Sequence, residues 1–171
     1  MSAGRRVLAA FAIAAIAAAP GCGYRLAGGN TFLPDRIRSI LVRPFDNRTQ
    51  RPEIDQRVTE AVARELSRRG GYRLAVRREE ADAVLEGVVT DYRTNPVQFD
   101  AEGRATRMEA VVILQATLRE RANDAVLWSQ TGLVFREQYD VREEALEEAI
   151  ALEDIAKGAA GALVTSMFEG F

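Results

Sequence analysis

The segment Arg107–Arg119 alternates between apolar and polar positions almost without interruption. Every second position is apolar: Met108, Ala110, Val112, Leu114, Ala116 and Leu118. The positions between them are charged or polar, except for Val111 and Ile113. Successive side chains of a β-strand point to opposite faces of a sheet, so this pattern predicts a long strand with one buried and one polar face. Other elements must then cover one side of that sheet.

Two segments have the spacing of amphipathic helices that can provide this cover. Pro52–Arg69 places its apolar residues on one face: Ile54, Val58, Ala61, Val62 and Leu66. Glu143–Met167 has a second stripe: Leu152, Ile155, Ala156, Ala159, Leu163 and Met167. Both patterns repeat every three to four residues, as in a helix that lies on a sheet. Gly158 and Gly161 are expected to let the second helix approach the sheet closely.

Four further segments have the character of strands. Ile37–Arg43 and Tyr72–Val76 are short. Ala83–Tyr92 is apolar on both sides, which predicts a central strand covered on each face. Val126–Tyr139 follows the alternating segment after a polar turn, so the two should form a long antiparallel hairpin. This order of elements predicts one domain, a two-layer α+β sandwich with helices on one face and the other face partly open.

The N-terminus is expected to be an export signal. Arg5 and Arg6 precede the apolar run Val7–Ala19, and small residues then lead to Cys22. Basic, apolar and small residues in this order are typical of a secretory signal peptide. The run is too short to cross a bilayer as a helix, which takes about 20 residues. The arginine pair leaves twin-arginine export as an alternative, but the rest of that signal is missing, so Sec export is expected.

Cys22 is expected to be a lipidation site. It follows Ala19-Pro20-Gly21, which resembles the lipobox of bacterial lipoproteins, in which small residues fit a peptidase cleft and a lipid transferase alkylates the thiol. Lipoboxes usually have leucine in place of Ala19 and seldom have proline at the position of Pro20. A plain signal peptide with an incidental cysteine is therefore the alternative. Several chains such as palmitate on one cysteine anchor firmly, because burial contributes about 0.8 kcal/mol per CH₂.

Cleavage before Cys22 would divide the chain into three parts. Residues 1–21 are then the signal peptide, residues 22–36 a lipid-anchored tether, and residues 37–171 the single α+β domain. Gly23 follows the cysteine, where an aspartate would retain a lipoprotein at the inner membrane of enteric bacteria. If the source follows that rule, the expected location is the outer membrane, on its periplasmic side.

The residue types exclude several kinds of chemistry. Histidine is absent and there is one cysteine. Histidine general bases, Ser/His/Asp triads and the commonest transition-metal ligand are therefore excluded. Loss of Arg5 and Arg6 with the signal takes the formal net charge from −2 to −4, so nothing points to nucleic acid. We expect a protein that binds partners, with no catalytic residues, cofactor or metal.

An acidic cluster opens the predicted second helix and has two interpretations. It consists of Glu143, Glu144, Glu147 and Glu148. These carboxylates could be imagined as metal ligands. Acidic residues are also favoured by the positive end of the helix dipole, so a solvated helix start is the preferred interpretation.

Arg93, Arg104 and Arg107 are the candidate lipid-binding residues. They flank the predicted loop Thr94–Ala105, which also carries Phe99. Guanidinium groups beside an apolar loop can hold the phosphates of a lipid headgroup through paired hydrogen bonds. Ordinary surface arginines are the alternative interpretation.

Many short segments together resemble one family, the lipopolysaccharide-assembly lipoprotein LptE. The similar segments are Gly21–Leu26, Leu33–Pro34, Ile37–Ile40, Arg43–Thr49, Arg64–Leu66, Ala81–Gly87, Tyr92, Pro96–Val97, Phe99–Asp100, Gly103–Thr106 and Val126–Trp128. They span nearly the whole chain after the signal. No single segment is diagnostic, but their order and spacing together are fairly specific.

The resemblance implies a fold and a role. The fold would be two helices packed on a four-stranded mixed sheet. The role would be a plug inside the outer-membrane β-barrel LptD, which helps the barrel assemble and binds lipopolysaccharide on its way to the cell surface. The basic positions linked to lipid binding in enteric members fall near Phe99–Gly103 and at the start of the last helix. This chain has Asp100 and glutamates there, so Arg104 and Arg107 are neighbours of those positions and not matches.

Two other classes of protein remain as alternatives. Lipoproteins of secretion pores and lipoprotein activators of peptidoglycan synthases have an order of strands and loops similar to the one predicted for this chain. They would be expected to carry a long tether or a pore-forming segment, which this sequence does not show. A periplasmic enzyme that uses carboxylates alone is the third alternative, and nothing beyond the number of acidic residues favours it.

Overall fold

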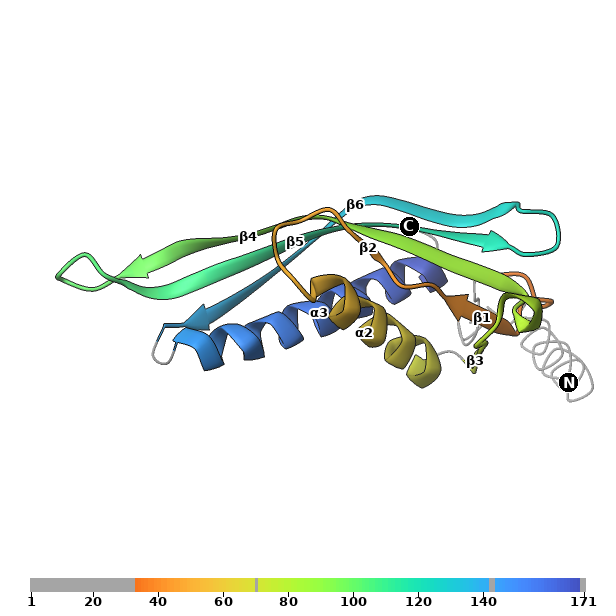
Figure 1. Ribbon diagram of the computed structural model, residues 1–171, viewed down its shortest axis with the longest axis horizontal. Helices are drawn as coiled ribbons and strands as arrows, with labels where there is room; N and C mark the ends of the chain where they lie inside the picture. Colours follow the sequence, from red (N-terminus) through yellow and green to blue (C-terminus); the bar gives the residue numbers. More distant parts are fainter. Residues whose placement is uncertain (1–32, 70, 142–143, 170–171) are drawn as a thin grey trace, which may run out of the picture.

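The computed structural model describes residues 33–69, 71–141 and 144–169, and the side chains of the last helix from Glu148 onward. Two helices lie side by side beneath one sheet (Figure 1). The expected signal peptide, Cys22 and most of the expected tether lie outside the described residues. Within the described residues, no helix is both long and apolar enough to span a membrane.

The sheet is mixed, and its strands follow the order β3-β1-β4-β5-β6, with β2 paired to β4 beside β1. Their bounds are β1 Ser39–Val42, β2 Asp46–Asn47, β3 Arg73–Leu74, β4 Ala83–Phe99, β5 Ala105–Glu120 and β6 Val126–Asp140. β1 is parallel to both β3 and β4, and β2 is parallel to β4. β4, β5 and β6 form an antiparallel meander of long strands. The predicted α+β sandwich is confirmed.

The strand number implied by the family resemblance is wrong. Five strands lie on the path of the sheet, and β2 makes a sixth. Each of the five segments expected to be strands overlaps one of the five path strands. The one strand that no expected segment covers is β2, whose two residues pair with β4 over that length only. Two residues carry no periodicity that a sequence pattern could reveal.

The helices bury the faces that their spacing predicts. α2 spans Ile54–Arg69 and α3 spans Glu144–Glu169. Every residue of both predicted stripes is buried and belongs to one apolar core. The alternating apolar residues of β5 from Ala110 to Leu118 lie in the same core. The helices therefore cover the face of the sheet that the alternation of β5 predicts.

The other face of the sheet has no helix among the described elements (Figure 1). The strand register places Glu86 opposite Thr117 and Val88 opposite Gln115 on this face. β4 is central, as predicted, but the expectation that elements cover it on both sides is wrong. The side chains of β4 that point to this face lie next to polar side chains of β5, and no second layer of the described residues covers them. This exposed surface is called the open face below.

A hydrogen-bonded aspartate ties β1 to the start of β4. Asp82 accepts hydrogen bonds from the backbone N–H of Arg38 at 3.0 Å, the backbone N–H of Ser39 at 2.9 Å and the Ser39 hydroxyl at 2.8 Å. The Arg38 and Ser39 bonds hold the pKa of Asp82 below its ordinary value against the opposing effect of burial. Ser39 is 1% exposed, and its buried hydroxyl is satisfied by its hydrogen bond to Asp82.

Residues before β1 also contact the body. Leu33 is 3% exposed and belongs to the core, although its position lies within the range expected as a tether. Arg36 donates to the carboxylate of Glu120 at the end of β5, at 2.6 Å and 3.1 Å. The chain therefore reaches the body at the end of the sheet where β4 begins and β5 ends.

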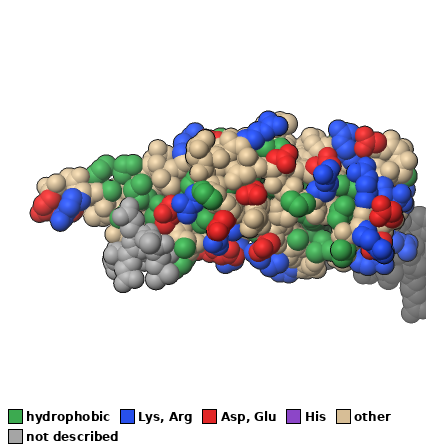
Figure 2. All heavy atoms as spheres, in the orientation of Figure 1, with side chains coloured by type: hydrophobic (Ala, Val, Ile, Leu, Met, Phe, Trp, Pro, Cys, Tyr) green, Lys and Arg blue, Asp and Glu red, His purple; other side chains and the backbone are tan. Residues whose placement is uncertain are grey.

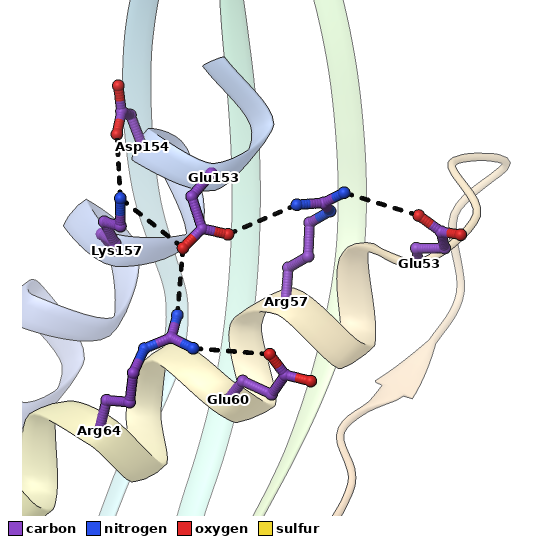
Figure 3. A network of polar contacts seen from close by, with 7 residues as sticks. All are labelled: Glu53, Arg57, Glu60, Arg64, Glu153, Asp154 and Lys157. Carbon is purple, nitrogen blue, oxygen red and sulfur yellow. Dashed lines mark hydrogen bonds and ion pairs between the residues drawn. The ribbon is translucent and has the colours of Figure 1, made fainter. Parts of the chain in front are cut away.

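An ion-pair network joins the two helices on their exposed side (Figure 3). Glu153 of α3 lies between Arg57 and Arg64 of α2, at 3.4 Å and 3.2 Å. Lys157, on the same helix as Glu153, is 3.6 Å from it. Such partly exposed pairs contribute little to stability singly, so we assign the network a role in setting how the helices lie against each other.

Gly158 lets α3 approach β6, as its position in the sequence predicts. A Cβ atom at this position would lie 1.9 Å from Cζ of Phe135, which is closer than any real contact. The Phe135 ring thus occupies the space that a side chain at residue 158 would need. Gly161, expected to act in the same way, has nothing within 4 Å of such an atom.

Replacing Gly158 with alanine is expected to destabilise the fold. The added methyl must displace the Phe135 ring, and overpacking of this kind costs about 1–3 kcal/mol. Gly161→Ala is the matched control: it adds the same methyl to open space, so the higher helix propensity of alanine should raise stability by up to about 1 kcal/mol. Urea unfolding of both variants measures the difference. Equal stability of the two would contradict the proposed contact.

Candidate functional site

The β4–β5 hairpin extends beyond both helices at one end of the molecule (Figure 1). We call residues 93–107 the distal hairpin. Its strands are longer than predicted: residues 94–99 and Ala105 belong to β4 and β5, so the expected loop Thr94–Ala105 is reduced to a turn over residues 100–104. The pairing continues past shifts in register near Pro96 and Gln98, where the sequence pattern is irregular. Most of its side chains are exposed.

Apolar and charged side chains lie together on the distal hairpin. Val97 is 44% exposed and Phe99 is 57% exposed. Figure 2 shows apolar side chains gathered along this projecting end, with acidic and basic groups at its tip. An exposed apolar pair at the end of a projecting hairpin is unfavourable in water, so it suits a surface that contacts another molecule.

Each of the three candidate arginines lies beside a carboxylate. Arg93 donates to Asp91 at 2.8 Å, and Arg107 donates to Asp140 at 3.0 Å. Arg104 donates to Asp100 at 2.8 Å through Nε. All three pairs are exposed to solvent. A phosphate would therefore have to exchange with a carboxylate, which is feasible because exposed ion pairs are held weakly.

The structure brings two of the three arginines into one hollow. Arg104 and Arg107 line a shallow depression at the base of the turn, together with Gln98, Thr106 and Asp140. Arg93 does not line it. The register instead places Arg93 opposite Val111, on the open face four residues along β5 from Arg107. The three arginines thus share one end of the molecule but not one pocket.

Arg136 of β6 is a basic residue of this region that the sequence analysis did not single out. It lies opposite Val111, so Arg93, Val111 and Arg136 form one row across three strands. Arg136 is 3.8 Å from Glu109. The alternation of β6 could have placed Arg136 on the open face, but only the registers of β4 with β5 and of β5 with β6 set it in the same row as Arg93.

Asp100 organises the turn of the distal hairpin. Its carboxylate accepts hydrogen bonds from the backbone N–H groups of Arg104 at 2.8 Å and Glu102 at 3.0 Å, besides the bond from the Arg104 guanidinium. The backbone N–H of Arg104 is the largest cause of a lowered pKa of Asp100, which burial opposes. The aspartate that departs from the family's basic pattern is thus a structural residue of this turn.

Arg51 braces the base of the distal hairpin against α3. Its guanidinium donates to Glu148 at 2.7 Å and lies 5.8 Å from the ring centre of Tyr92. Burial raises the pKa of Tyr92, while the positive charge of Arg51 opposes this effect. Glu148 therefore pairs with an arginine, whereas the side chains of Glu143, Glu144 and Glu147 lie outside the described residues. In the part of the chain with described side chains, no three acidic residues are grouped to hold a metal ion.

Comparison with known proteins identifies similar folds and one family. The family model described as "LptE: Lipopolysaccharide-assembly" matches residues 37–167, from just before β1 to near the end of α3. A direct search of curated protein sequences finds no significant match.

Three solved structures illustrate the similarity of the fold. The PelC dodecamer from Paraburkholderia phytofirmans has 22% identity over 79% of this chain and 92% of its own, with a TM-score of 0.54. Uncharacterized lipoprotein B from Nitrosomonas europaea has 15% identity over 86% and 96%, with a TM-score of 0.52. Rare lipoprotein B from Shewanella oneidensis has 12% identity over 74% and 94%, with a TM-score of 0.50. At these identities, the similarity concerns the fold alone.

Removing the Arg104 guanidinium should shift the titration of Asp100 only in part. In Arg104→Gln, the backbone N–H groups still donate to Asp100, so the pKa of Asp100 should rise toward 3.8 but stay below it. Because the pKa is lowered in the folded state, the stabilisation is present above the unfolded pKa and is lost as pH falls through the folded pKa. Carboxyl NMR titration measures the shift. A full return to 3.8 would show that the guanidinium alone lowers the pKa.

Proposed function

The chain belongs to the LptE family of lipopolysaccharide-assembly proteins, and from this membership we propose that it is the lipoprotein plug of the outer-membrane β-barrel LptD. In this role it assists the assembly of the barrel and binds lipopolysaccharide for delivery to the cell surface. The observation that carries the proposal is the family match over residues 37–167. This range includes α2, nearly all of α3, every strand and all three candidate arginines.

The shape of the molecule is compatible with a plug. β4 has 17 residues, and at a rise of about 3.3 Å per residue this one strand spans roughly 55 Å of the elongated molecule. The hollows over the described residues are shallow and open, and lined by charged and polar groups of the strands. A plug needs a surface that matches the wall of the barrel and no enclosed active site. This supports a role in binding without catalysis, as in the rest of the family.

The distal hairpin is the proposed contact for lipopolysaccharide. Guanidinium groups bind phosphates through two parallel hydrogen bonds, and Arg93, Arg104 and Arg107 are exposed enough to turn toward a ligand. Exposed Val97 and Phe99 lie between them along the chain and could contact acyl chains. When the arginines bind phosphate, their ion pairs with the carboxylates would break, and water would solvate the carboxylates instead. Their presence makes the site close to neutral when empty, and its affinity for phosphates modest.

Acylation of Cys22 is the proposed means of attachment to the outer membrane. The lipobox-like residues Ala19-Pro20-Gly21 support it, together with lipoproteins of similar fold in two other bacteria. The described part of the chain begins at residue 33, at the end of the sheet where Arg36 contacts Glu120. The distal hairpin is at the other end of β4, so the anchor and the candidate lipid site would lie at opposite ends of the body.

A lipoprotein of another system is the second candidate. PelC, which has a similar fold, is described as a dodecamer, and a secretion-pore subunit would be expected to form such a ring. A peptidoglycan-synthase activator would instead bind a synthase. Both candidates predict a different assembly from a plug, so the assembly decides between them.

Purification of the native lipidated protein in mild detergent should yield one very large β-barrel in equal amount. This result is expected because a plug contacts its barrel over most of its surface. Mass spectrometry and native mass measurement give the partner and its ratio. A homomeric ring or a cell-wall synthase in place of the barrel would contradict the proposal and support the second candidate.

Removing the three candidate arginines should weaken binding of purified lipopolysaccharide. Arg93, Arg104 and Arg107 changed together to glutamine should raise the Kd about tenfold, since the net gain from charge-assisted hydrogen bonds is reduced by the carboxylates they leave. The matched control changes three other arginines together to glutamine, Arg43, Arg68 and Arg77, because each is also exposed and paired with a carboxylate but lies outside the distal hairpin. Calorimetry with the detergent-solubilised protein measures both. An equal effect of the control would assign binding to overall charge.

A further inference from the structure

β6 forms a long unpaired edge of the sheet. It has 15 residues, and β5 is its one strand partner among the described elements. At the opposite edge, β3 and β2 have two residues each. Unpaired edge strands expose a row of backbone N–H and C=O groups that another strand can join. A long edge is therefore the part of this fold best suited to β-strand addition.

The register shows which backbone groups of β6 face outward. The Val141 N–H donates to the carbonyl of Thr106 on the β5 side, so residue 141 points its backbone groups inward. In an antiparallel pair this orientation alternates along the strand. The residues that point their N–H and C=O away from β5 are therefore Val134, Arg136, Gln138 and Asp140.

A bulge limits the usable edge to one segment. Gly132 has a φ of 72°, and the register with β5 shifts between the partners of Leu114 and Ala116. Bulges of this kind interrupt pairing along an edge. Beyond the bulge, Leu133–Asp140 keeps unbroken register with Leu114–Arg107. This segment, which we call the distal edge, is long enough for a strand of ordinary length.

The side chains around the distal edge include apolar groups open to solvent. Val134 is 43% exposed on the open face, and Ile150 of α3 is 49% exposed. Leu133 and Phe135 pack against the core but remain only partly buried. A strand laid along the edge would cover apolar surface on both faces of the sheet in addition to forming backbone hydrogen bonds.

We propose that the distal edge is a docking site for an extended segment of another polypeptide, which joins the sheet antiparallel to β6. Antiparallel pairing continues the pattern of β4, β5 and β6. The proposal concerns the sheet edge and does not depend on lipid binding by the distal hairpin.

The charges of the distal edge indicate that its occupant is not a second copy of this chain. The two antiparallel registers that pair the segment with itself most fully are centred on Arg136 and on Glu137. Each sets identical charges directly opposite one another, which is destabilising in a sheet. Within the described residues, Glu137 has no ion pair, and the single carboxylate near Arg136 is Glu109 at 3.8 Å. The fitting occupant has an acidic residue opposite Arg136 and a basic residue opposite Glu137.

A synthetic strand tests the proposal on the full chain in mild detergent. The probe is a capped peptide of alternating valine and threonine, as long as the distal edge, with glutamate set opposite Arg136 and lysine opposite Glu137. The control peptide has these two charges exchanged. NMR titration should show the largest amide shifts at Val134, Arg136 and Gln138, and the control should bind at least about fivefold more weakly.

Two variants separate the edge backbone from the side chains. Gln138→Pro removes an outward N–H but no bond to β5, so it should fold and bind the peptide at least about tenfold more weakly. Gln138→Ala keeps that N–H and should bind within about twofold of the unchanged chain. If the Gln138→Pro variant does not fold, the Arg136→Glu variant is used in its place. It should bind the probe more weakly than the unchanged chain does, and should bind the control peptide at least as well.

Three results would overturn the proposal. They are no binding of the probe, equal binding of both peptides, and concentration-dependent dimers of the full chain that Gln138→Pro abolishes. The last would assign the edge to a second copy. None of these results tests binding to the barrel or to lipopolysaccharide, so the proposed function is tested by separate experiments.

Discussion

Burial of the alternating face of β5 is the constraint on which the rest of the structure depends. From Ala110 to Leu118, its apolar residues lie in the same core as the stripes of α2 and α3. Since a two-residue period exposes the other face of the same strand, a single helical layer is sufficient and a second would meet polar groups. The open face follows from this one-sided cover.

The one-sided cover also explains why the hollow at the candidate lipid site is shallow and open. β4 and β5 continue past the ends of the helices (Figure 1), and the side chains of Arg93, Arg104 and Arg107 at this end are exposed to solvent. Such an open surface is expected to bind a ligand weakly alone and more tightly when a second wall covers it. A barrel around the hairpin would supply that wall, and this agrees with the role that family membership supports.

Most of the elements could be predicted from local patterns, whereas their extent could not. The stripes of both helices and the five periodic strand segments were predicted from spacing, which depends on neighbouring residues only. The strands of the distal hairpin run longer than expected because pairing with each other, and not burial, maintains residues 94–99. β2 was missed for the same reason: its two residues are held by β4 and by no pattern of their own.

The sequence by itself determined which faces are buried, that histidine chemistry is excluded, and the family to which the chain belongs. The tertiary structure decided which charges meet. That Asp140 pairs with Arg107, that Arg136 stands across Val111 from Arg93, and that Val134 to Asp140 lie on a free edge all depend on strand register. Register is set by packing between segments far apart in the chain, so no local pattern of residues contains it.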